Sequence, residues 1–74
     1  MKILDLHKMR HEDVKDRCHQ FININWGRPL KIITGNSREM QNLVCEVINF
    51  YDLEFHVGGV SGTEGYIRIR SLDV

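Results

Sequence analysis

The sequence lacks the features of a membrane-spanning protein, of a secreted protein and of a structural metal site. No apolar run approaches the length of a membrane span, and the first residues do not form an apolar signal region. Its two cysteines, Cys18 and Cys45, stand inside separate helical apolar patterns rather than in a paired motif. We therefore expect buried free thiols and a cytoplasmic, reducing setting. Because His11, His19 and His56 show no metal-ligand spacing with these cysteines, a zinc site is not expected.

An excess of one charge is also missing, because ten basic and ten acidic residues cancel. No overall field therefore steers the protein to nucleic acid or to a membrane, although charge can still segregate locally. With 74 residues, of which 42% are hydrophobic, the chain can build one domain with a two-layer core but no deep pocket. Any functional site is therefore expected on the surface.

Hydrophobic periodicity predicts the element order β-α-β-α-β-β. Apolar residues at helical spacing predict helices at 11–25 and 38–51, with Ser37 as the cap of the second helix and His19 solvated on the first. Short runs rich in β-branched residues predict strands at 2–6, 30–34, 54–57 and 66–70, and the glycines from Gly58 to Gly65 predict a loop. We expect an α/β two-layer sandwich, a single domain over 1–74, with a four-stranded mixed sheet and two helices on one face.

The other face of the sheet is then open to solvent. Side chains two apart in a strand share a face, so Leu4 and Leu6 point into the core while Asp5 and His7 point outward together. They do so near the carboxyl end of the strand, where binding groups collect in α/β layers. The carboxylate could orient the imidazole and set its tautomer, although the pair could equally be part of a solvated polar face.

The last predicted strand repeats this alternation. Its isoleucines point inward, while Tyr66, Arg68 and Arg70 point outward, and Glu54 and His56 are expected on the same open face. An aromatic ring followed by guanidinium groups suits base stacking with phosphate contact. The alternative is that the charges only keep an exposed strand soluble.

A glycine turn connects the second strand to the second helix. The segment Thr34-Gly35-Asn36-Ser37 delivers an apolar strand into a helix N-terminus, where unpaired N–H groups and the helix dipole favour an anion. The alternative is an ordinary turn with a serine cap. The segment matches neither a P-loop nor a dinucleotide-binding fingerprint, so nucleotide hydrolysis is not indicated.

Taken together, three segments resemble the Smr (small MutS-related) domain over residues 3–69. Leu4-Asp5-Leu6-His7 matches four positions of a Leu-Asp-Leu-His-Gly signature, and the residues from Thr34 to Asn36 match three of Thr-Gly-x-Gly. Gly65-Tyr66-Ile67-Arg68-Ile69 is similar to the closing strand of the family. Lys8 and Ser37 replace the two remaining signature glycines, which puts cleavage more in doubt than the fold.

The resemblance implies a sheet of order 1-2-4-3 and binding of DNA or RNA, and some family members are endonucleases. By position, the residues associated with activity are Asp5, His7, Thr34 and Gly35. In a nuclease, His7 would be the general base or acid and Asp5 would orient it. The phosphate would be held by Lys8, Arg10 and the turn N–H groups of residues 35–37.

No cofactor is expected: a divalent metal could bind Asp5, but a single carboxylate provides too few ligands to hold one firmly. Three hypotheses for the function remain: a nucleic-acid-binding module, a true endonuclease, and a non-catalytic adaptor that docks onto a larger nucleic-acid-processing protein. The zero net charge favours the adaptor slightly, because small nucleic-acid binders are more often basic.

Overall fold

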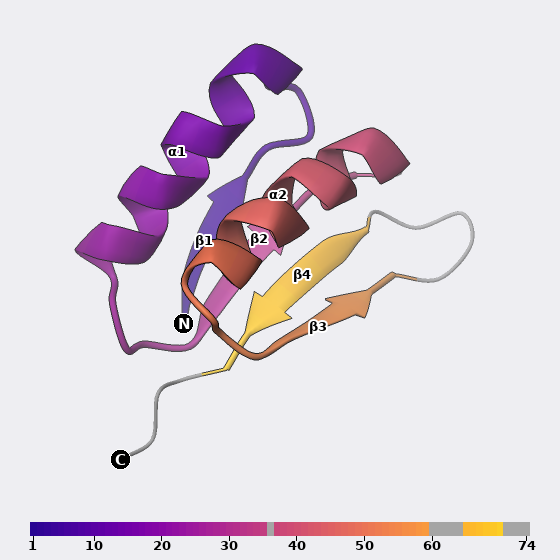
Figure 1. Ribbon diagram of the computed structural model, residues 1–74. Coiled ribbons are helices and arrows are strands. Elements are labelled where there is room, and N and C mark those ends of the chain that lie inside the picture. The colour runs from indigo at the N-terminus through magenta and orange to yellow at the C-terminus, as the bar shows by residue number, and fades with distance from the viewer. Residues whose placement is uncertain (36, 60–64, 71–74) are drawn as a thin grey trace.

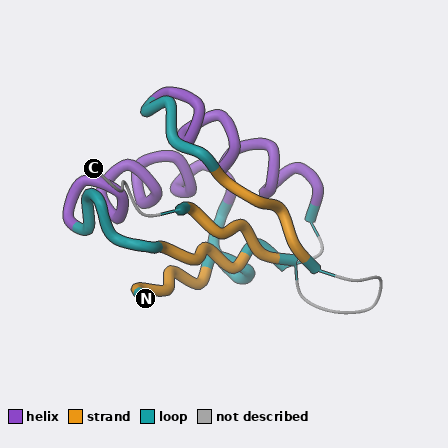
Figure 2. Tube along the Cα trace, turned by 90° about the horizontal axis from the view of Figure 1, so that it is seen from below, coloured by secondary structure: helices purple, strands orange, loops and turns teal. Residues whose placement is uncertain are grey.

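The structure, a computed structural model, describes residues 1–35, 37–59 and 65–70. It has two layers, a four-stranded sheet and a pair of helices that lie side by side on one face of it (Figures 1 and 2). The elements follow the order β1 (Lys2–Asp5), α1 (His11–Ile24), β2 (Leu30–Ile33), α2 (Arg38–Phe50), β3 (Phe55–Gly58) and β4 (Tyr66–Ile69). The predicted fold is confirmed.

The element boundaries differ from the predicted ones by one residue. Asn25 and Tyr51 are the C-caps of α1 and α2 rather than their last helical residues. Strand β3 begins and ends one residue later than predicted, so that Gly58 belongs to the strand and not to the following loop. Of that predicted loop, residues 60–64 lie outside the described part of the chain.

The strands lie in the order β1-β2-β4-β3, which is the order that the family resemblance implies. Strand β1 runs parallel to β2, while β4 is antiparallel to both β2 and β3. The last strand therefore lies between the second and the third. Consequently β1, β2 and β3 all end at the same edge of the sheet, called the rim below.

The core lies between the sheet and the helices. Leu6, Ile32 and Ile67 from the sheet side are fully buried against Val14 and Val44 from the two helices. The alternation read from the sequence is confirmed, because the neighbours of these sheet residues face away from the helices. Among the cysteines, only Cys18 is buried as predicted, whereas Cys45 is half-buried at the margin of the core.

Polar contacts join the two helices along their shared flank. The ammonium group of Lys15 lies 2.7 Å from the carboxylate of Glu46, and His11 lies 3.4 Å from Glu39 at the amino ends. The prediction that His19 is solvated is wrong. Its ring is half-buried and packs edge-on against Phe50 and Tyr51, which α2 brings from a distant part of the sequence.

In the part of the chain that the structure describes, no helix is long and apolar enough to cross a membrane.

Candidate functional site

The parallel pairing of β1 with β2 brings two sequence motifs together at the rim. Asp5 pairs with Ile33, and the N–H of Leu6 donates to the carbonyl of Ile33 at 2.8 Å. His7 and Gly35 therefore follow neighbouring strand ends. A Cβ atom added to Gly35 would lie 3.2 Å from the Cβ of His7, so the backbone of the turn contacts this side chain directly.

Asp5 and His7 form a hydrogen-bonded pair beside this turn. The backbone N–H of His7 donates to Oδ1 of Asp5 at 3.1 Å, and ring atom Nδ1 contacts the same oxygen. The side-chain hydrogen bond and then the backbone one hold the pKa of the Asp5 carboxyl below its ordinary value. With Nδ1–H donated to the carboxylate, a neutral ring keeps Nε2 as an acceptor, which is the requirement for a general base.

The glycine turn is not the open amide cradle that its sequence suggests. The N–H groups of Thr34 and Gly35 both donate to the carbonyl of Gly65, at 3.0 and 3.1 Å, and the N–H of Gly65 donates back to Gly35. The expectation that Gly35 offers a free N–H to a phosphate is therefore wrong. Thr34 is buried, and its hydroxyl donates to the Gly35 carbonyl. Asn36 lies outside the described residues.

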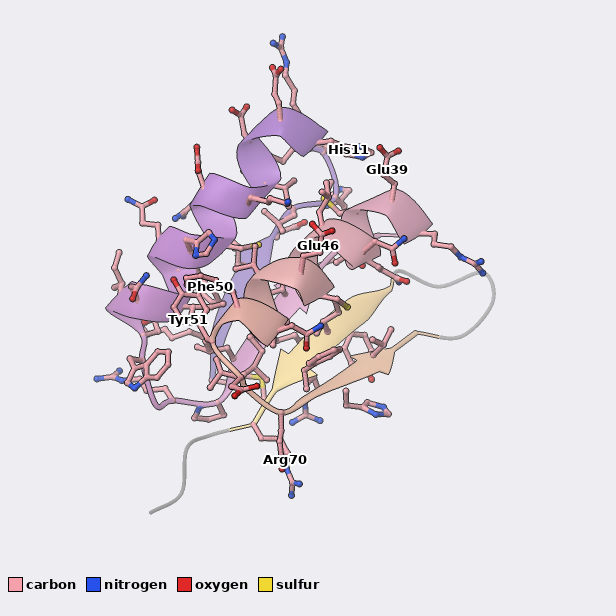
Figure 3. All side chains as sticks on the ribbon, in the orientation of Figure 1. His11, Glu39, Glu46, Phe50, Tyr51 and Arg70 are labelled. Atoms are coloured by element: carbon pink, nitrogen blue, oxygen red, sulfur yellow. The ribbon has the colours of Figure 1, made fainter. Side chains whose placement is uncertain are left out.

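The amino ends of both helices lie at the rim. Ser37 caps α2 as predicted, since its hydroxyl oxygen accepts from the N–H of Met40 at 3.1 Å. Figure 3 shows His11 of α1 and Glu39 of α2 together at this end. The positive ends of two helix dipoles therefore point to the same side as the Asp5–His7 pair.

Lys8 and Arg10 lie on the connection from β1 to α1, and both side chains are exposed. Arg10 is 3.6 Å from the carboxylate of Glu12, an exposed pair of little energetic weight. Both cations thus stand near the Asp5–His7 pair along the chain.

Basic side chains cross the open face of the sheet in one row. The strand register places Lys31, Arg68 and His56 next to one another on β2, β4 and β3, and we call the two charged residues, Lys31 and Arg68, the cationic row. Like charges directly opposite one another destabilise a sheet, so the fold itself gains nothing from Lys31 facing Arg68. Lys31 is a candidate site residue that was not predicted from the sequence. Its place between Leu30 and Ile32, which are both buried, indicates that its side chain points away from the core.

Tyr66 lies beside the cationic row. The ammonium group of Lys31 is 4.7 Å from the centroid of the Tyr66 ring, within the range of a cation–π contact. The ring also covers Gly58 of β3, because a Cβ atom at that glycine would fall 2.2 Å from Cζ of Tyr66. Tyr66 is therefore held over the sheet, half-buried, next to the basic side chains.

Arg70 is separated from the predicted site residues at the rim. It follows the end of β4 that lies away from the rim, roughly 13 Å along the strand from Tyr66. Figure 3 shows it projecting from the molecule, and its guanidinium lies 3.4 Å from the carboxylate of Glu54. An open depression of about 790 Å³ lies at this far end, lined in part by Arg68 and Arg70. The candidate site at the rim, by contrast, consists of exposed side chains on the surface of the molecule.

Among residues 1–35, 37–59 and 65–70, no group of three or more His, Cys, Asp or Glu side chains could hold a metal ion. No protein-family model, curated protein or solved structure gives a significant match to this chain. The sequence motifs and the geometry of the rim are therefore the basis for inferring its function.

Proposed function

We propose that this protein is an Smr-like domain that binds DNA or RNA across its rim and open sheet face. The observation that carries the proposal is the Asp5–His7 pair in contact with the Gly35 turn. The cationic row and Tyr66 continue this surface across the sheet. Phosphates would bind Lys31, Arg68 and Lys8, while a base would stack at the ring of Tyr66.

The binding experiment measures affinity for labelled single- and double-stranded DNA and RNA as a function of salt concentration. Arg68→Ala and Lys31→Ala are each expected to weaken binding and to reduce the slope of log K against log salt by about 0.7–0.9. Arg17→Ala is the matched control, because Arg17 is exposed on α1 in the helix layer, away from the open face. Unchanged binding in both sheet variants, or an equal loss in Arg17→Ala, would contradict the proposed surface.

Phosphodiester cleavage is the further activity that this surface suggests. His7 Nε2 would accept the proton of a water molecule or a ribose hydroxyl, whose oxygen then bonds to phosphorus. The bond from phosphorus to the leaving ribose oxygen breaks, and that oxygen takes up a proton from solvent. The anionic transition state would be stabilised by Lys8 and Arg10 and by the helix amino ends, since the Gly35 N–H is already paired.

A nicking assay with supercoiled plasmid and with structured RNA tests cleavage. Activity in the wild type that is lost in His7→Ala supports an endonuclease. Absence of product from both proteins, with oligonucleotide binding intact, leaves the binding module alone. Lys8 and Ser37, which stand where the family has glycines, make this second outcome a real alternative.

The adaptor is the competing function, and the zero net charge favours it. Failure to bind any nucleic acid at low salt, together with stable binding of a defined protein partner, would select it over the proposed function.

A further inference from the structure

A second exposed surface lies at the end of the helix layer that is opposite to the rim. Four rings meet there, with centroids 5.1–5.6 Å apart and edge-on contacts, and we call them the aromatic patch: His19, Trp26, Phe50 and Tyr51. Figure 3 shows Phe50 and Tyr51 at the carboxyl end of α2, while Glu39 marks its amino end at the rim. The patch is therefore separate from the proposed nucleic-acid surface.

The fold does not account for the exposure of two of these rings. Phe50 is 74% exposed and Trp26 is 49% exposed. Phe50 lies on the outer side of α2, whose other exposed residues include Asn42, Glu46 and Asn49. A large apolar side chain in these polar surroundings contributes little to the stability of the fold, because most of it stays exposed to water. It does offer apolar contact area to a partner.

Hydrogen bonds hold the patch in place. The hydroxyl of Tyr51 lies 2.7 Å from Nδ1 of His19 and accepts from Nδ2 of Asn23 at 2.8 Å. The same Asn23 amide donates to the backbone carbonyl of His19. His19 and Tyr51 are thus fixed before any partner arrives, and Phe50 and Trp26 pack edge-on against them, which lowers the entropy cost of binding.

The carboxyl ends of the two helices favour a cation at the aromatic patch. Both helices end here, and neither has a basic residue in its last turn to neutralise the negative end of its dipole. The exposed Asp52 directly follows the patch. Arg28, two residues beyond Trp26, borders a depression with Met1, Lys2 and Pro29.

We infer that the aromatic patch docks a basic peptide segment of a partner protein, with Lys or Arg side chains over the π faces of Phe50 and Trp26. Electron-rich ring faces and the negative ends of the two helix dipoles both attract such cations. The same features repel a phosphate backbone, which is why the proposed partner is a basic peptide rather than nucleic acid. This inference is independent of the function proposed for the rim.

Trp26 provides the measurement, because it is the only tryptophan of the chain and belongs to the patch. Its fluorescence is followed while a synthetic peptide of alternating arginine and serine is added, and then an equally long peptide of glutamate and serine. We expect a saturable change with the basic peptide alone. Phe50→Leu should weaken that binding roughly two- to fivefold, since leucine keeps the apolar surface but lacks the ring. Phe50→Tyr keeps a ring and should bind the peptide as the wild type does.

Ile24→Ala is the matched control, because Ile24 is 72% exposed near the same end of α1 but belongs to none of the ring contacts. Its affinity should equal that of the wild type. Equal binding of both peptides, no saturable binding of the basic one, or equal losses in Phe50→Leu and Ile24→Ala would overturn the inference. The inference would also be overturned if Trp26 responded to a single-stranded oligonucleotide and not to the basic peptide. Self-association that rises with protein concentration and is abolished by Phe50→Leu would overturn it as well.

Discussion

The ring of Tyr66 lies across the backbone of Gly58, its directly paired neighbour on strand β3. An aromatic side chain that covers a strand glycine shields a backbone that would otherwise be exposed, and the pair stabilises the β3–β4 edge. The glycine also fixes the position of the ring beside Lys31. Stability and the proposed base-stacking position therefore depend on the same contact.

Gly58→Ala is expected to push the Tyr66 ring off the sheet and to lower the free energy of unfolding by about 1–3 kcal/mol. In a Tyr66→Ala background the same change should be neutral or slightly stabilising, because the clash is gone and alanine restricts the unfolded chain. Urea unfolding of the four proteins gives the coupling between the two positions. Additive effects would show that the ring does not lie on this glycine.

Gly35→Ala tests the contact between the turn and His7. Gly35 has a φ of +72°, and Gly27 has a φ of +83°, so alanine at either position is strained by about 1–2 kcal/mol. Only at Gly35 does the added Cβ also meet His7, whereas at Gly27 nothing lies within 4 Å. We expect the larger loss of stability in Gly35→Ala, together with a shift of the His7 imidazole signals in NMR spectra. Equal losses and an unmoved imidazole would contradict the juxtaposition.

The Asp5 carboxyl makes stability depend on acidity. Its pKa is lower in the folded protein than in the unfolded chain, owing to the hydrogen bonds from His7. The deprotonated group therefore contributes stability that is fully present above the unfolded pKa and is lost as the pH falls through the folded pKa. In Asp5→Asn this part of the acid destabilisation should disappear. A carboxyl titration by NMR with an ordinary Asp5 pKa would rule it out.

Asp52→Gly is expected to stabilise the protein. Asp52 has a φ of +59° after the C-cap of α2, a position where glycine is preferred. Relief of this strain should raise the free energy of unfolding by about 1 kcal/mol and the melting temperature by about 4–8 °C. Asp52→Ala removes the same carboxylate but retains a Cβ atom, so it should give no gain. A similar gain in both variants would assign the effect to the charge instead.

The two thiols should differ in reactivity. Burial raises the pKa of the Cys18 thiol to about 12, and burial also raises the pKa of the more exposed Cys45 thiol. Since the thiolate is the reactive form, iodoacetamide should modify Cys45 first and Cys18 only when urea opens the core. Mass spectrometry after timed quenching, with Cys45→Ser as the single-thiol control, measures both rates. Rapid modification of Cys18 in the native protein would be inconsistent with its burial.

The architecture was predictable because local patterns and the burial they imply agree. Ile67 and Ile69 alternate with outward residues in β4, and Val44, Val47 and Ile48 form one helical stripe that faces the sheet. Strand parity also predicted that Asp5 points away from the core, and His7, which follows the end of β1, is exposed beside it. These features depend on neighbours within a few residues of one another, which a sequence displays directly.

Contacts between distant segments could not be read in the same way. The pairing of Gly35 with Gly65 occupies the amide that the turn sequence offered to a phosphate. The aromatic patch forms only because α1 and α2 end together, and His19 is half-buried for that reason. Arg70 has the same strand parity as Tyr66 but follows the opposite end of β4, which parity alone does not reveal.

The central position of β4 has a consequence for the order of events during synthesis. β4 separates β2 from β3, so a chain that ends before Tyr66 leaves β3 without a neighbour and one side of β2 unpaired. Such a nascent chain can pair only β1 with β2. Completion of the sheet must therefore wait until residues 66–69 have left the ribosome, and C-terminal truncations that remove them should be open to proteolysis.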